Sequence, residues 1–157
     1  MESQLHVLSE SLDEKLKVLK EIQEYNLRQE QAFKNGEADL EDFDEAVEEK
    51  DRLIERLMRL DDGFETMYAK LAEELKENRK YYAEQIKELQ IKITKVTEMG
   101  VTIQAQEARN KKLVEDYFAK ARAGIRQNRQ SSKAAYDYYK SMSGVHLDQS
   151  HFMDSKQ

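Results

Sequence analysis

Residues 40–60 read LEDFDEAVEEKDRLIERLMRL, and this stretch decides the fold class. Its apolar residues recur at steps of three, four or seven, and charged residues fill most of the positions between them. Because an α-helix turns once in about 3.6 residues, this spacing places the apolar groups on one face. The pattern therefore predicts an amphipathic helix over 40–60 with Asp39 as its N-cap. Its apolar stripe consists of Leu40, Phe43, Val47, Ile54, Leu57 and Leu60.

The same spacing continues on both sides of this stretch and predicts further helices over 3–34, 64–98 and 101–139. The chain contains no proline and only 5 glycines, so it has few residues that stop a helix. Asn35-Gly36 provides a left-handed helix end. Gly63 and Gly100 are two further weak points, and the sequence leaves open whether each is a turn or a bend.

The composition fits one elongated helical domain. Charged residues make up 37% of the 157 residues and hydrophobic residues 39%, with a mean hydropathy of -0.91. A narrow helical seam needs fewer apolar residues than a deep globular core. We therefore expect an all-α protein, an elongated antiparallel helical hairpin or bundle of three to four long helices over residues 1–140. Residues 141–157 are expected to form a flexible partner-binding tail.

The residue types present argue against several classes of function. The net charge of -6 disfavours nucleic-acid binding, which needs a basic surface. The chain lacks cysteine, glycine-rich phosphate loops and metal-binding His motifs, so we expect no cofactor, no metal and no catalytic residues. No apolar run approaches the length of a membrane span, and the first residues do not resemble a signal peptide. These features predict a cytoplasmic protein that is not an enzyme.

Charge is distributed unevenly along the chain. Residues 37–65 hold 13 acidic and 4 basic side chains, whereas residues 101–140 hold 9 basic and 4 acidic ones. Opposite signs favour these two stretches as neighbours, although each exposed ion pair contributes only a few tenths to about 1 kcal/mol. Two solvated helix faces would give the same composition.

The end of the chain contains the candidate binding residues. Three tyrosines within four residues cannot all face one seam, so we expect at least one to be exposed as an interface residue. The following tail contains more apolar groups than a solvating tail needs, and it can fold on a partner, dock on its own bundle or remain inert. The candidate partner-binding residues are Tyr136, Tyr138, Tyr139, Val145, Leu147, Phe152 and Met153.

Three stretches resemble the FlgN family of flagellar type III export chaperones in its Gram-positive form. The first is the leucine- and lysine-rich pattern of 39–60, which includes Lys50, and the second is Asn-Lys-Lys-Leu-Val at 110–114. The third is the chain end, Tyr136 to Lys140 followed by Ser-His-Phe-Met-Asp-Ser-Lys at 150–156. The first two patterns occur in many helical bundles, and the third is the more specific one.

The resemblance implies a cytoplasmic, non-enzymatic helical chaperone. Such a protein would hold the hook-filament junction proteins FlgK and FlgL and deliver them to the cytoplasmic domain of the export gate. It would bind them largely through its C-terminal region, which corresponds here to the tyrosines and the tail. Small and polar residues at Gly124, Asn128 and Ser132 predict a thin core there, which would leave a groove for an amphipathic cargo helix.

Two other interpretations remain open. The chain could serve a different export substrate, such as the filament cap. It could instead be a structural coiled coil that forms a homodimer, in which Asn26 and Asn78 near seam positions would fix the register.

Overall fold

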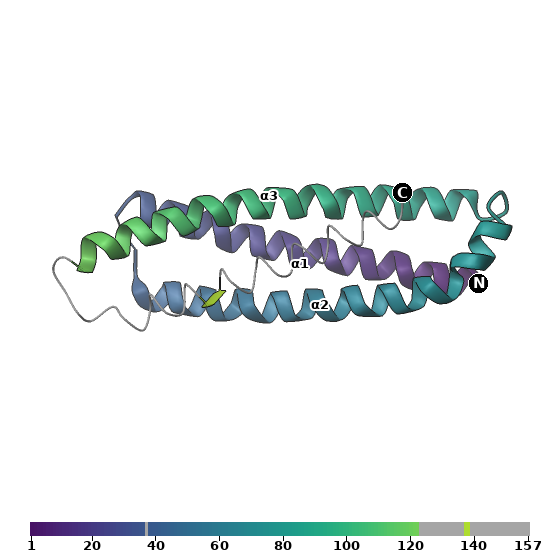
Figure 1. Cartoon of the computed structure of the whole chain (residues 1–157), viewed down its shortest axis with the longest axis horizontal. Helices are drawn as coiled ribbons and strands as arrows, with labels where there is room; N and C mark the ends of the chain where they lie inside the picture. The colour runs from purple at the N-terminus through teal and green to yellow at the C-terminus, as the bar shows by residue number, and fades with distance from the viewer. Residues whose placement is uncertain (37, 123–136, 139–157) are drawn as a thin grey trace.

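Three long helices make up the structure, a computed structural model that describes residues 1–36, 38–122 and 137–138. They are α1 (Glu2–Lys34), α2 (Leu40–Glu77) and α3 (Ala83–Arg122), and the described residues contain no strand. Helix α1 packs against both other helices, whereas the described backbones of α2 and α3 do not contact each other. Figure 1 shows α1 between α2 and α3 in an elongated bundle. The predicted all-α bundle of long helices is confirmed, with three helices.

Local sequence signals set the connection between α1 and α2 as predicted. Gly36 has a φ of 68°, the left-handed conformation that glycine adopts without steric cost. The Asp39 side chain accepts a hydrogen bond of 2.9 Å from the backbone N–H of Glu41, which satisfies one free donor of the first turn. The predicted helix end and the predicted N-cap are both confirmed.

The predicted helix boundaries beyond residue 60 are wrong. Helix α2 continues through Gly63 to Glu77, and α3 continues through Gly100, so neither glycine is a turn. The chain reverses at residues 78–82 instead, inside the stretch predicted as helix 64–98. Asn78 is the C-cap residue of α2. Its side-chain amide donates to the backbone carbonyl of Glu74 at 3.0 Å, which satisfies a carbonyl of the last turn.

Length explains the position of this reversal. Helix α1 has 33 residues and α2 has 38, so they extend for roughly 50 and 57 Å. By residue 77, α2 extends along the whole of α1. The apolar residues that follow residue 77 can therefore be buried against α1 only if the chain reverses direction. Tyr82 is buried at this turn, and Tyr81 beside it is 72% exposed.

The core consists of the apolar stripes of the three helices and ends in a cluster of aromatic rings. Phe33 of α1 makes edge-to-face contacts with Phe43 of α2 and Tyr117 of α3, with ring centroids 5.3 and 5.2 Å apart. Phe43 also contacts Phe118 at 6.3 Å. These contacts connect all three helices beside the α1–α2 connection, because each ring reaches a neighbouring helix.

The substitution Gly63→Ala tests whether α2 is continuous. A methyl group added at Gly63 would meet no heavy atom of the described residues within 4 Å. Since glycine inside a helix costs up to about 1 kcal/mol relative to alanine, we expect a gain in unfolding free energy of about 0.5–1 kcal/mol. Gly36→Ala should instead lower it by about 1 kcal/mol, because φ is positive there. Urea denaturation measures both, and a loss of stability in Gly63→Ala would show that α2 is broken at that residue.

Candidate functional site: a buried polar layer and an adjoining acidic groove

A layer of buried polar side chains crosses the bundle next to the aromatic cluster. Every helix contributes to it, and each of these residues is at most 5% exposed. Its members are Asn26 and Gln29 of α1, Lys50 of α2, and Gln106, Glu107 and Asn110 of α3. Burial of polar groups is costly unless they are hydrogen-bonded, so the contacts within this layer determine its effect on stability.

Lys50 is the centre of the layer, and its side chain is completely buried. Its Nζ donates to Gln29 Oε1 at 2.9 Å and lies 3.1 Å from Glu107 Oε1. This ammonium group therefore joins α2 to α1 and to α3 through charge-assisted hydrogen bonds. This pair joins the acidic stretch 37–65 to the basic stretch 101–140, although the described backbones of α2 and α3 do not contact each other. However, this ion pair has the opposite polarity, because its lysine comes from the acidic stretch and its glutamate from the basic one.

Tyr138 completes the environment of Lys50. The Tyr138 hydroxyl donates to Glu107 Oε1 at 2.5 Å, and the Lys50 Nζ lies 4.0 Å from the centroid of the Tyr138 ring. An ammonium group at this distance from an aromatic ring is attracted by the electron-rich face of the ring. The Tyr138 side chain is 1% exposed, so this residue from the C-terminal region fills the space between α2 and α3 at the polar layer.

Burial lowers the pKa of Lys50 from 10.5 to about 8. Removal of the ammonium group from water is the largest cause, and the nearby Glu107 carboxylate opposes it only in part. The cost of desolvation therefore exceeds the attraction between the two charges. Helix α2 carries a second perturbed group, because partial burial and then the Glu55 carboxylate raise the pKa of Asp51.

The remaining members of the layer bond mostly to each other. Asn26 Nδ2 donates to Gln106 Oε1 at 3.3 Å, and Asn110 Nδ2 donates to the backbone carbonyl of Asn26 at 2.9 Å. Four buried atoms of the layer have no hydrogen-bond partner among the described residues: Asn26 Oδ1, Gln29 Nε2, Glu107 Oε2 and Asn110 Oδ1. Such atoms are uncommon in folded proteins and indicate places where a ligand or water can bind.

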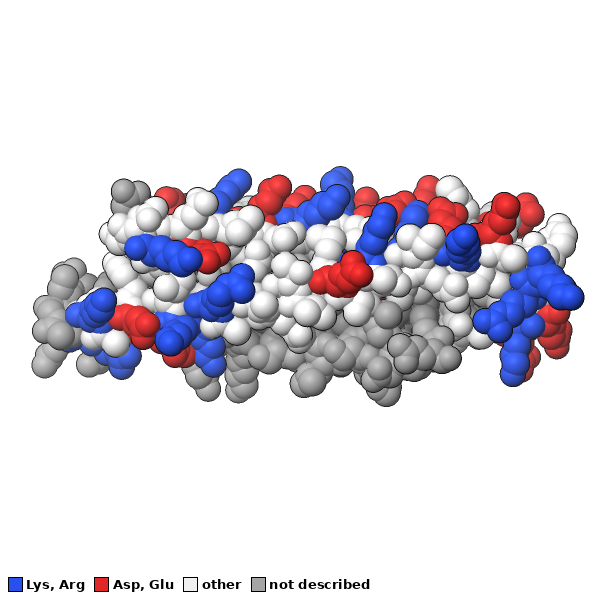
Figure 2. All heavy atoms as spheres, turned by 90° about the horizontal axis from the view of Figure 1, so that it is seen from above, with Lys and Arg blue, Asp and Glu red and all other residues white. Residues whose placement is uncertain are grey.

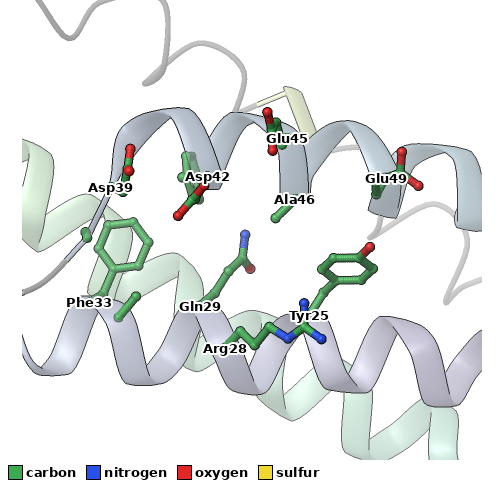
Figure 3. Close-up of a pocket in the computed structure, with 12 residues that line it drawn as sticks. Tyr25, Arg28, Gln29, Phe33, Asp39, Asp42, Glu45, Ala46 and Glu49 are labelled. Carbon is green, nitrogen blue, oxygen red and sulfur yellow. The ribbon is translucent and has the colours of Figure 1, made fainter.

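An acidic groove of about 460 Å³ adjoins this layer between α1 and α2. Among the described residues, its lining contains the four carboxylates of Asp39, Asp42, Glu45 and Glu49 and one basic residue, Arg28. Figure 3 shows Gln29 extending from α1 toward α2, with its side-chain nitrogen directed into the space between Asp42 and Ala46. Gln29 therefore belongs to both features, since its oxygen binds Lys50 and its nitrogen faces the groove.

Of the residues predicted to bind a partner, only Tyr138 is among the described ones. Tyr136, Tyr139, Val145, Leu147, Phe152 and Met153 lie outside them, as do the predicted thin core at Gly124, Asn128 and Ser132 and the proposed tail 141–157. Tyr138 lies inside the bundle, so a partner could reach it only by displacing it from Glu107. The binding role of these residues stays a prediction.

Sequence reasoning gave no separate role to the polar layer. One signal was available: Lys50 lies three residues after Val47 and four before Ile54, which places a charge on the apolar stripe. A lysine at such a position needs a partner from another helix. The identity of that partner, Glu107, could not be read from the spacing because it depends on how α2 and α3 align.

Taken together, the fold and the site define an all-α, three-helix bundle with a charged interior and an acidic groove. No protein family, curated protein or solved structure matches the chain. Over the described ranges, no helix has the length and apolar character to span a membrane. Within the same ranges, no three His, Cys, Asp or Glu side chains come together in a way that could hold a metal ion.

Proposed function

We propose that this protein is a cytoplasmic export chaperone of the FlgN type, which binds FlgK and FlgL before their export and delivers them to the export gate. The observation that carries the proposal is the way α2 and α3 are arranged on α1. Both helices pack on α1 without backbone contact between them among the described residues, and Tyr138 of the C-terminal region lies between them. Such an arrangement can accept a further amphipathic segment, which is how helical chaperones cover their cargo.

The surface of the bundle fits a partner-binding role better than a self-associating one. The large exposed apolar side chains are spread over all three helices and the turn: Val7, Leu27, Met58, Tyr81, Ile91 and Val101. Val7 and Leu27 are far apart on α1, so they do not continue the heptad spacing that a dimeric coiled coil needs. Asn26, considered as a register residue for a dimer, is buried inside the chain's own bundle, and Asn78 ends α2. Figure 2 shows acidic and basic side chains mixed on one long face.

Titration of purified protein against FlgK and FlgL from the same organism tests the proposal. We expect a dissociation constant in the micromolar range or tighter for the full chain, and weaker binding for a variant that ends at residue 140. The shorter variant keeps Tyr138 and its contacts with Lys50 and Glu107, so a loss of binding would come from residues 141–157.

Circular dichroism provides the control, because the shorter variant should retain the helical signal of residues 1–122. Equal binding by both forms would exclude a role for the tail. A lack of binding by both forms would exclude FlgK and FlgL as cargo. A chaperone for another export substrate or a structural dimer would then be the better interpretation, and a melting temperature that depends on concentration would favour the dimer.

A further inference from the structure

We propose that the acidic groove between α1 and α2 is a binding site for a basic peptide segment of a partner protein. The groove lining includes neither Lys50 nor Tyr138. The proposal is independent of the export role and holds whether or not FlgK and FlgL are the cargo.

Charge complementarity selects a cationic ligand. The described residues that line the groove carry four carboxylates and one guanidinium, so their net charge is negative. Asp42 and Glu45 make no ion pair within the described part of the chain, and Glu49 pairs only with Arg52 on the exposed side of its own helix. Carboxylates spaced along one helix can pair with several cationic side chains of a single bound segment, which gives specificity and faster association.

Gln29 supplies the second, independent feature. Its side chain is 5% exposed, its Oε1 accepts from Lys50 Nζ, and this bond fixes the orientation of the amide. Its Nε2 then faces the groove and has no acceptor among the described residues (Figure 3). A buried donor without a partner is energetically costly, so a ligand that offers an acceptor there is favoured.

A peptide provides both kinds of group that the groove requires. Its backbone carbonyl can accept from Gln29 Nε2, and its Arg or Lys side chains can pair with Asp42 and Glu49. Phe33 and Tyr25 add aromatic surface for the apolar parts of the same segment. The Arg28 guanidinium lies 5.5 Å from the Tyr25 ring centroid, so the groove edge already holds one contact between a cation and an aromatic ring.

Fluorescence anisotropy with a labelled synthetic peptide tests this site on the full chain. The probe is an amphipathic peptide of arginine and leucine, and the control peptide replaces each arginine by glutamate. We expect micromolar binding of the arginine peptide at low salt and none of the control. The variant Asp42→Asn/Glu49→Gln should weaken binding about tenfold, because it removes the two carboxylates that pair with the arginine side chains.

The matched control variant is Glu73→Gln/Glu77→Gln, which removes the same charge from exposed positions in the last two turns of α2. It should change the affinity less than about twofold if the groove is the site. In NMR spectra of the wild-type chain, the side-chain amide signals of Gln29 should shift on titration, and those of exposed Gln90 should not.

Three results would overturn the proposal. The first is no binding of the arginine peptide, and the second is an equal loss of affinity in both variants, which would indicate attraction to overall charge. The third is an unchanged Gln29 signal at saturating peptide, which would place the peptide elsewhere on the surface.

Discussion

Replacing Lys50 by methionine is expected to lower the free energy of unfolding by about 3–5 kcal/mol. The substitution keeps the volume of the side chain but removes the charge that faces the buried Glu107 carboxylate. Glu107 would then keep one bond, from the Tyr138 hydroxyl, and its Oε2 already has no partner within the described residues. A buried carboxylate without a partner lowers the stability of the folded state, because it has lost its hydration and gained no compensating contact. Urea denaturation at neutral pH, monitored by circular dichroism, measures the loss.

A double substitution distinguishes two causes of lost stability: a buried Glu107 carboxylate left without its partner, and the absence of the ion pair itself. In Lys50→Met/Glu107→Gln both charges are absent, and the glutamine carbonyl can still accept from the Tyr138 hydroxyl. We expect most of the stability to return, to within about 1–2 kcal/mol of the wild type, because the desolvation of both ions is also avoided. The lowered pKa of Lys50 supports this expectation, since it shows that burial outweighs the attraction between the charges.

Lys70→Met is the matched control for this pair of variants. Lys70 is an exposed lysine on the same helix, so its loss should change stability by less than about 0.5 kcal/mol. If Lys50→Met and the double variant were equally unstable, Glu107 would not be the group that depends on Lys50.

Raising the pH should stabilise the wild-type protein relative to Lys50→Met. In the unfolded chain Lys50 keeps its proton up to about pH 10.5, whereas in the folded protein its pKa is about 8. Between these values the unfolded state binds more protons, so stability rises with pH. The cost of burying the ammonium group is fully present below about pH 8. The free energy of unfolding of the wild type, relative to Lys50→Met, should therefore rise by about 2 kcal/mol between about pH 7 and pH 9.5.

The comparison with Lys50→Met removes the contributions of other titrating groups from this measurement. Glu107, Asp51 and Tyr138, which surround Lys50, are present in both proteins. An NMR titration of the Lys50 side chain would give its pKa directly. A value near 10.5, together with identical pH dependence in the two proteins, would contradict the proposed cause of the shift.

The polar layer also explains how the three helices are aligned. Lys50 has partners from α1, from α3 and from the C-terminal region at one height of the bundle. A shift of α2 by one helical turn would place the ammonium group among apolar residues, at a cost of several kcal/mol. The apolar stripes alone tolerate such a shift better, because one leucine can replace another. We infer that the layer contributes more to specificity of alignment than to net stability.

Local residue chemistry determined the helices themselves. The spacing of Phe43, Val47 and Ile54 requires one buried face, Asp39 caps the first turn of α2, and Gly36 allows the backbone to leave α1. These features depend on residues within a few positions of each other. The sequence alone was therefore sufficient to predict them, together with the all-α class and the near absence of helix-stopping residues.

Only the tertiary structure decided where α2 ends and which charges meet. The glycines at 63 and 100 are weak helix residues, but a long helix tolerates their cost of about 1 kcal/mol when both sides pack on α1. The reversal at residues 78–82 follows from the length of α1, which no local pattern contains. Three features bring together residues from separate segments of the chain. They are the ion pair between Lys50 and Glu107, the hydrogen bond from Tyr138 to Glu107, and the acidic groove between α1 and α2. These contacts depend on how the helices are aligned in space, and that alignment is set by the packing of α2 and α3 on α1.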